Sequence, residues 1–336
     1  MTQYIIRRIL WFIPVLFCVG LITFTIAQLT PGGPFDAGRD ETSRRMPSGA
    51  EQVLRERFGM DLPMWRQFTR YMFFDISTNQ ETGEREIVWG AIGGNLGPTY
   101  SSRGQRTVQQ ELFEGSGDNP SRFYYSARLG MQALLIAVTF GIPLGVVAAL
   151  KQNSWIDYFS LLFATSFVAL GSLVISILFV VIFATSLGWF NVLPDWDEPI
   201  RPWVLPSFAL GLASMGYIAR LTRSSVLEVK RQDYVRTAHS KGLAEQVVIW
   251  RHVVRNALLP VVTIMGPLIA AFLTGTLFAE YIFEVPGMGL KLVQAIGERD
   301  YSMIMGGALI YTFILSFSNL LVDLAYGIVD PRISLK

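Results

Sequence analysis

Residues 158–187 read YFSLLFATSFVALGSLVISILFVVIFATSL, a stretch of thirty residues without a charged side chain. A transmembrane helix needs about 20 mostly apolar residues to cross roughly 30 Å of hydrocarbon, so this stretch predicts a membrane span. A straight helix of this length would measure about 45 Å. We therefore expect the segment to tilt, to project beyond the membrane or to break near Gly171-Ser172; a tight helical hairpin is the alternative.

Five further apolar runs are long enough to span a membrane: Ile9–Leu29, Leu129–Leu150, Trp203–Arg220, Leu259–Glu280 and Met303–Ile328. Apolar residues make up 51% of the chain and charged residues 16%, against about 25% charged residues in a soluble protein. This composition indicates an integral membrane protein. The first run follows Arg7 and Arg8 as in a signal peptide, but it is long and lacks a small-residue cleavage site, so we expect a retained helix.

The placement of charge favours six spans. The segment 221–258 holds seven Lys and Arg residues against three acidic residues, whereas 188–202 holds three acidic residues and Arg201. Basic loops tend to stay in the cytoplasm. Six spans with both termini in the cytoplasm place 221–258 inside, whereas a hairpin at 158–187 would place it outside. The sequence therefore predicts an all-α integral membrane protein with six transmembrane helices.

Composition divides the chain into three parts. Residues 1–29 form an N-terminal transmembrane helix, 30–126 a large extracytoplasmic insert between the first two helices, and 127–331 a core of five helices. The insert can serve as a docking surface for an outside partner or as a cap over the helix ends, and both interpretations stay open.

Several local structures are expected inside the insert. Pro31 to Pro34 predict an exit turn, and apolar spacing predicts helices over Ala50–Phe58 and Pro63–Phe74. In the second helix the apolar side is formed by Trp65, Phe68 and Met72. The Gly-, Asn- and Thr-rich residues 75–100 predict a hairpin or an irregular loop.

The residue inventory excludes several functions. The chain has one cysteine, two histidines and a net charge of +2, which argues against a zinc or iron–sulfur site and against nucleic-acid binding. It contains no Gly-Lys dipeptide, so it has no Walker A loop. We expect no catalytic residue, no metal and no cofactor bound by this chain.

The segment 221–258 carries the most informative pattern. It divides at Gly242, after which Leu243, Val247, Trp250, Val254 and Ala257/Leu258 recur at helical spacing and predict one apolar stripe on a helix. Such a helix either lies passively at the lipid interface or presents a rigid surface to a cytoplasmic partner.

Four motifs, in the same order along the chain, resemble a known family. The first is Arg7-Arg8 with Pro31-Gly32. The second, which begins in the segment 221–258, is Arg236-Thr237-Ala238 with Gly242, followed by the run from His252 through Arg255-Asn256-Ala257-Leu258 to Pro260. The third is Val285-Pro286-Gly287-Met288-Gly289, and the fourth is Asp330-Pro331-Arg332. The chain resembles ABC importer permease subunits of the dipeptide/oligopeptide/nickel transport family. It lacks the Glu of the commonest coupling-loop motif, and its loop is longer; both departures match this subfamily.

The resemblance implies a type I ABC importer fold and a set of partners. These are a second homologous permease subunit, one or two cytoplasmic ABC ATPases that bind ATP and Mg²⁺, and an extracytoplasmic substrate-binding protein, assembled in a prokaryotic plasma (inner) membrane. It also implies a coupling loop that contacts an ATPase, formed here by Tyr234, Arg236, Thr237, Ala238, Lys241, Gly242, Trp250, His252, Asn256 and Pro260.

Peptides are the expected substrate and nickel or another small solute the alternative. Nickel prefers His, Cys or carboxylate ligands, but His239 and His252 both lie on the cytoplasmic loop. A membrane-embedded enzyme is disfavoured because the predicted spans contain no His and no pair of Asp residues. A membrane-anchored receptor or assembly factor that uses residues 30–126 stays open.

Overall fold

The computed structural model describes residues 2–30, 55, 58–78, 85–115, 117, 119–192 and 194–329. These form two compact units. The first consists of the described residues of 126–286 and 315–329, and the second of the described residues of 2–125 and 287–314. The expected exit turn at Pro31–Pro34 and most of the expected helix over Ala50–Phe58 lie outside the described residues.

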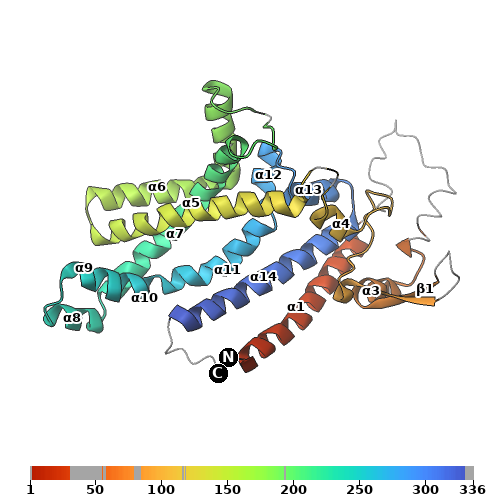
Figure 1. Ribbon diagram of the computed structural model, residues 1–336, viewed down its shortest axis with the longest axis horizontal. Helices are drawn as coiled ribbons and strands as arrows, with labels where there is room; N and C mark the ends of the chain where they lie inside the picture. The colour runs from red at the N-terminus through yellow and green to blue at the C-terminus, as the bar shows by residue number, and fades with distance from the viewer. Residues whose placement is uncertain are drawn as a thin grey trace. The chain divides into compact units, whose positions relative to one another are not determined.

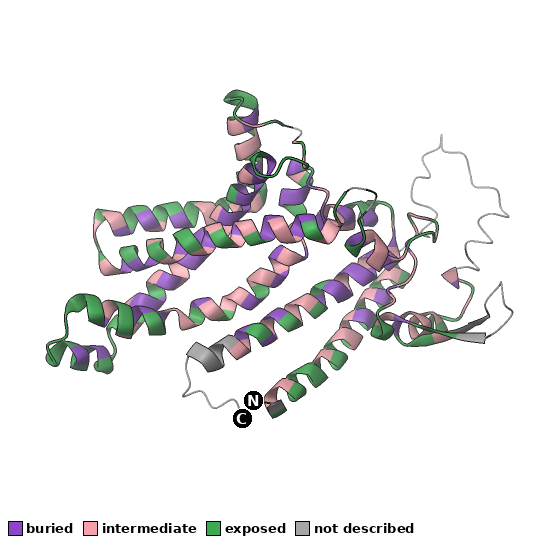
Figure 2. Ribbon diagram, in the orientation of Figure 1, coloured by how far each residue is buried: buried purple, intermediate pink, exposed green. Residues whose placement is uncertain are grey.

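Six helical segments of the described chain are long and apolar enough to cross a membrane, which confirms the predicted number of spans. They are Gln3–Leu29, Arg122–Leu150, Trp155–Ser186, Arg201–Lys230, Leu259–Phe283 and Tyr301–Leu324. In an apolar 18-residue stretch of the first span only 6% of the residues are buried, and in that of the third span 17%. Figure 2 shows exposed residues along both helices. Apolar surface of this kind suits contact with lipid.

In the first unit, helices α5 (Arg122–Leu150), α6 (Trp155–Phe179) and α7 (Arg201–Lys230) lie side by side (Figure 1). Glycines permit their close approach. A Cβ atom on Gly145 of α5 would lie 2.5 Å from the Ala219 carbonyl oxygen of α7, and one on Gly216 of α7 would lie 2.4 Å from the Ala164 carbonyl oxygen of α6. Small residues let membrane helices pack backbone to backbone.

The helix α6 breaks at the predicted place. Gly171 has φ 66° and ψ 168°, a combination that essentially only glycine adopts. The chain therefore changes direction there and continues through Phe179 into a π-helix, η2 (Val180–Ser186). This break accommodates thirty apolar residues without one straight helix of that length.

The fifth span was predicted as one run, Leu259–Glu280, but it consists of two helices. Helix α11 (Leu259–Leu273) ends before Gly275, whose φ of 97° lies in the left-handed region, and α12 (Leu277–Phe283) follows. The carboxylate of Glu280 in α12 is fully buried and accepts hydrogen bonds from Ser126 Oγ at 2.8 Å and the Thr276 N–H at 3.2 Å. Hydropathy alone does not reveal this break, because the residues around it are apolar or small.

The second unit contains α1 (Thr2–Leu29), α3 (Met64–Met72), β1 (Phe74–Thr78), β2 (Arg85–Trp89), the 3₁₀-helix η1 (Ala91–Gly93), α4 (Val108–Phe113), α13 (Met288–Gly297) and the start of α14 (Tyr301–Val329). The helix predicted over Pro63–Phe74 is confirmed as α3. The Phe68 ring of α3 lies 5.6 Å from that of Phe17 and 5.4 Å from that of Phe24 in α1. Trp65, which the spacing put on the same apolar side of the helix, is 69% exposed; α3 packs on α1 through Phe68 and Met72.

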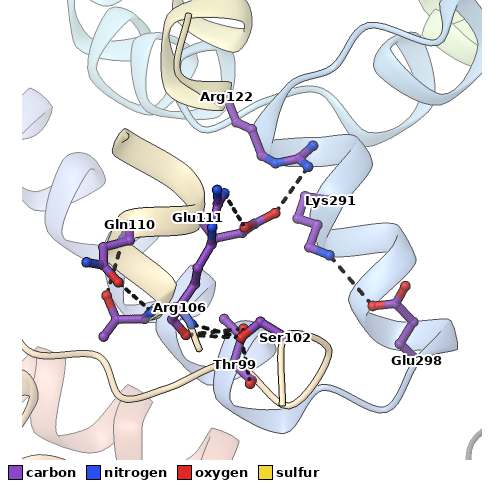
Figure 3. Close-up of polar contacts among 9 residues, drawn as sticks. Thr99, Ser102, Arg106, Gln110, Glu111, Arg122, Lys291 and Glu298 are labelled. Atoms are coloured by element: carbon purple, nitrogen blue, oxygen red, sulfur yellow. Dashed lines mark hydrogen bonds and ion pairs between the residues drawn. The ribbon is translucent and has the colours of Figure 1, made fainter. Parts of the chain in front are cut away.

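Strands β1 and β2 pair antiparallel, which selects the hairpin from the two alternatives for residues 75–100. The rest of this part of the insert is held by polar contacts (Figure 3). Glu111 of α4 accepts hydrogen bonds from Arg122 Nη2 at 3.1 Å and from Arg106 Nη1 at 3.5 Å. The two arginines thus connect Glu111 of α4 to the loop before α4 and to the start of α5. Outside the insert, Lys291 Nζ of α13 lies 3.7 Å from Oε2 of Glu298, the residue that follows this helix.

A buried carboxylate joins two loops of the second unit. Asp300 is fully buried and accepts hydrogen bonds from the Ser101 N–H at 2.9 Å and the Met303 N–H at 3.0 Å. Burial raises the pKa of the neighbouring Tyr100 hydroxyl to about 12, so Tyr100 stays neutral at physiological pH. The contact ties the loop before α4 to the start of α14.

Candidate functional site: the α8–α10 segment

Between α7 and α11 the chain forms a series of short helices, which we call the α8–α10 segment (residues 233–257). It comprises α8 (Asp233–Ser240), α9 (Glu245–Val247), the π-helix η3 (Val248–Val254) and α10 (Arg255–Ala257). Helix α7 continues to Lys230, beyond the predicted span end at Arg220. Residues 221–230 of the predicted loop are therefore a direct helical extension of α7.

Gly242 separates α8 from the helices that follow, as predicted. Its φ is 74°, and its N–H donates to the His239 carbonyl oxygen at 2.9 Å. No atom lies within 4 Å of the position that a Cβ would occupy. Glycine is therefore favoured here by the left-handed backbone and not by a lack of space.

The inner face of the segment is a small apolar cluster. Val235 and Ala238 of α8 pack with residues of η3 and α10 against the ends of α5 and α7. The buried members are Val146, Ala149, Val226, Val235, Ala238, Val248, Val253, Val254 and Ala257. Because the cluster joins the segment to two long helices, a displacement of the segment acts on both helices.

The predicted apolar stripe is only partly correct. Val254 and Ala257 are buried, but Leu243, Val247 and Trp250 are 41%, 42% and 65% exposed. Leu243 lies before α9 and belongs to no helix, and Val248–Val254 form the π-helix η3, in which hydrogen bonds join residues five apart. A pattern read at 3.6 residues per turn therefore identifies the wrong face before Val254.

Large apolar side chains on the segment consequently face outward. Tyr234 is 43% exposed and, with Leu243, Val247 and Trp250, forms a set that we call the outward apolar residues. Arg236 is 75% exposed and lies 3.7 Å from the 97% exposed Asp233. Exposed aromatic and aliphatic side chains flanked by basic residues are typical of a docking surface.

The structure brings together three of the ten residues predicted for the coupling loop. Asn256 Nδ2 donates to Tyr234 Oη at 3.0 Å and to the His252 carbonyl oxygen at 3.0 Å, which connects α8 to α10. Thr237 Oγ1 donates to the Asp233 carbonyl oxygen, Ala238 is buried in the apolar cluster, and Pro260 is the second residue of α11. Arg236, Lys241 and Trp250 are exposed.

Sequence reasoning missed one ion pair close to this segment. Arg223 was counted among the basic residues of the predicted loop, but it lies in α7 and forms two hydrogen bonds with Asp157 of α6, at 2.6 and 2.7 Å. The two residues are far apart in sequence and belong to no quoted motif. An acidic residue directly before the apolar run at 158–187 was the available signal.

Within the described ranges, no group of three or more His, Cys, Asp or Glu side chains is arranged to hold a metal ion. The large exposed side chains of the α8–α10 segment, among them Tyr234 and Trp250, form its outer surface. Its position between α7 and α11 connects that surface to two membrane-spanning segments.

Comparison with known proteins identifies the family. Residues 141–335 match the family model described as binding-protein-dependent transport system inner membrane component. The chain is 36% identical to the dipeptide transport system permease protein DppB of Bacillus subtilis, over 100% of this chain and 99% of the relative, and 33% identical to DppB of Alkalihalophilus pseudofirmus, over 99% of each. It is 31% identical to the glutathione transport system permease protein GsiC of Escherichia coli K12, over the full length of both. The chain therefore belongs to the family of binding-protein-dependent transport system inner membrane components, multi-pass transport subunits that are distinct from the ATPase.

Proposed function

We propose that this chain is the permease subunit that moves di- or oligopeptides through the membrane in an ATP-driven importer. The observation that carries the proposal is similarity over the whole chain to permeases named for dipeptide and glutathione transport. Glutathione is itself a small peptide, so both names point to one substrate class. Nickel is the second candidate from the sequence, but both histidines of the chain, His239 and His252, lie in the α8–α10 segment, which this proposal places in the cytoplasm and therefore away from the side where the substrate is captured.

The partners follow from the same proposal. A second homologous permease completes the membrane part, a binding protein delivers the peptide from outside, and one or two ATPases bind ATP and Mg²⁺ in the cytoplasm. Both termini and the α8–α10 segment are placed in the cytoplasm, because seven basic residues lie in 221–258. The insert of residues 30–126 then lies outside.

In this arrangement the α8–α10 segment is seated on one ATPase through its outward apolar residues. Burial of Tyr234, Leu243, Val247 and Trp250 in a groove would remove the largest exposed apolar side chains of the segment from water. Closure of the ATPases on ATP then displaces the segment. The apolar cluster that joins it to α5 and α7 passes this displacement to the membrane helices.

Uptake in the native cell tests the substrate class. Deletion of the chromosomal gene is expected to abolish uptake of a radiolabelled dipeptide such as alanyl-alanine and to leave uptake of radioactive Ni²⁺ unchanged. A plasmid-borne copy of the gene is expected to restore dipeptide uptake. Loss of Ni²⁺ uptake with normal dipeptide uptake would replace the peptide proposal by the nickel alternative.

Trp250 tests the docking surface. Trp250→Ser is expected to reduce recovery of the ATPase with the tagged chain about 30-fold, because a hot-spot tryptophan contributes about 2 kcal/mol or more to binding. The matched control is Trp155→Ser, which removes a 76% exposed tryptophan at the start of α6. Quantitative mass spectrometry of the purified complex measures both. Equal ATPase recovery from Trp250→Ser and wild type would remove Trp250 from the interface.

A further inference from the structure

The pair formed by Asp157 and Arg223 is bidentate and largely buried. Arg223 Nε lies 2.6 Å from Asp157 Oδ1 and Arg223 Nη2 lies 2.7 Å from Oδ2. The Asp157 side chain is 1% exposed and that of Arg223 20%. Asp157 Oδ2 also accepts from the Asn153 N–H at 3.0 Å, so the carboxylate is held from two directions.

The position of the pair relates it to a tight helix contact. Gly216 of α7 touches Ala164 of α6 through the backbone. Arg223 lies seven residues after Gly216 in α7, and Asp157 lies seven residues before Ala164 in α6, which runs antiparallel to α7. Seven residues are close to two helical turns, so both contacts lie on one seam between α6 and α7. One contact sets the separation of the helices, and the other sets their register.

The Asp157–Arg223 pair also lies close to the α8–α10 segment. Val226 of α7, almost one turn after Arg223, is fully buried in the apolar cluster with Val235, Ala238 and Val248 of the α8–α10 segment. A displacement of that segment therefore reaches α7 at the level of Arg223. A bidentate guanidinium–carboxylate contact resists both sliding and rotation, because two parallel hydrogen bonds fix its geometry.

We propose that Asp157 and Arg223 are positioning residues for transport, which keep α6 in register with α7 while the α8–α10 segment moves. The proposal rests on the proposed function, since it assumes that an ATPase moves the segment. It adds α6 to the helices that the segment moves, although the apolar cluster contains no buried residue of α6. Energy from ATP then reaches the α5–α6–α7 layer as one block.

The test separates positioning from stability. Asp157→Leu with Arg223→Met replaces the pair by apolar side chains, a change that often preserves or raises the stability of a folded protein. The charge-exchanged variant Asp157→Arg with Arg223→Asp restores an ion pair in reverse. Both variants are made in a Cys18→Ser background, because Cys18 is the chain's single cysteine. Spin labels are then attached to cysteines introduced by Phe159→Cys in α6 and Ser224→Cys in α7. Both of these positions are exposed.

The complex purified through this chain is compared in proteoliposomes without nucleotide and after trapping with ATP and orthovanadate. Wild type is expected to show the same dipolar broadening between the two labels in both states. The apolar variant is expected to melt at the wild-type temperature and to hydrolyse ATP, yet to change its broadening on trapping and to lose at least tenfold of its alanyl-alanine uptake per ATP hydrolysed. The charge-exchanged variant is expected to recover part of the wild-type dipolar broadening and part of the wild-type uptake per ATP hydrolysed.

Two results would overturn the proposal. In the first, α6 and α7 change their separation in wild type on trapping. In the second, the apolar variant keeps both the wild-type broadening and the wild-type uptake per ATP, which would make the pair purely structural. Absence of an ATPase from the purified wild-type complex is a different result, because it contradicts the proposed function and not the register of the two helices.

Discussion

Gly242→Val is expected to abolish peptide uptake while the chain still inserts into the membrane. Gly242 has a φ of 74°, and an L-residue in the left-handed region costs roughly 1–2 kcal/mol, with β-branched residues affected most. The strain is relieved if the turn changes, and the turn sets the direction in which the chain leaves α8. A change of 1–2 kcal/mol alters a population by a factor of about 5–30, which is enough to move the docking surface out of place.

The surroundings of Gly242 allow a sharp control. No atom lies within 4 Å of a Cβ at this position, so a side chain meets no steric obstacle and only its backbone preference matters. Gly242→Asn adds a side chain of similar size but tolerates the left-handed region, and uptake is expected to stay near wild type. Uptake of alanyl-alanine and ATP hydrolysis in proteoliposomes measure the effect. Normal transport by Gly242→Val would show that the turn at 242 has no role in coupling.

The membrane architecture was predictable because one physical requirement dominates it. Each span must satisfy its backbone hydrogen bonds internally over about 30 Å of hydrocarbon, so six apolar runs produce six spans. The break at Gly171 was also predictable, since thirty apolar residues exceed the membrane thickness and glycine is the residue that adopts φ 66° and ψ 168°. The left-handed turn at Gly242 follows from the same property of glycine.

The inner and outer faces of the α8–α10 segment were not predictable from periodicity. The π-helix over Val248–Val254 shifts the register, so Trp250 is exposed where a regular helix would bury it. A π-helix is rare and occurs mostly as a single turn inside an α-helix, so apolar spacing read at 3.6 residues per turn does not anticipate it. An exposed Trp250 is compatible with both interpretations of the segment, docking to a cytoplasmic partner and a position at the lipid interface.

The Asp157–Arg223 pair and the break before α12 were missed for a related reason. Both features depend on which helices are neighbours. Mean hydropathy is calculated along a single stretch of sequence, so it contains no information about neighbouring helices. Asp157 precedes an apolar run and was given no interpretation of its own, and Arg223 was counted only among the basic residues of 221–258. Only the antiparallel packing of α6 against α7 brings them within 2.6 Å.

Gly216→Leu is expected to prevent this packing and to cause the largest loss of folded protein. A Cβ at position 216 would lie 2.4 Å from the Ala164 carbonyl oxygen and 3.1 Å from Val168 Cγ2, so α6 and α7 must separate to admit any side chain. Lipid tails are as apolar as the helices, and close packing is therefore a main source of helix association in the membrane. Overpacking commonly costs about 1–3 kcal/mol, and here the obstacle is backbone that no rotamer change can move.

The consequence extends along the seam to the ion pair. When α6 and α7 separate at Gly216, Asp157 and Arg223 two turns away lose their bidentate contact, and a buried charge without its partner destabilises by about 3–5 kcal/mol. The monodisperse fraction on size-exclusion chromatography and the melting temperature in detergent measure the combined effect. Gly297→Leu is the matched control, because Gly297 is helical and has no atom within 4 Å of its Cβ position. If Gly216→Leu purifies and melts like Gly297→Leu, the α6–α7 seam does not hold the first unit together, and the register proposed for Asp157 and Arg223 loses its support as well.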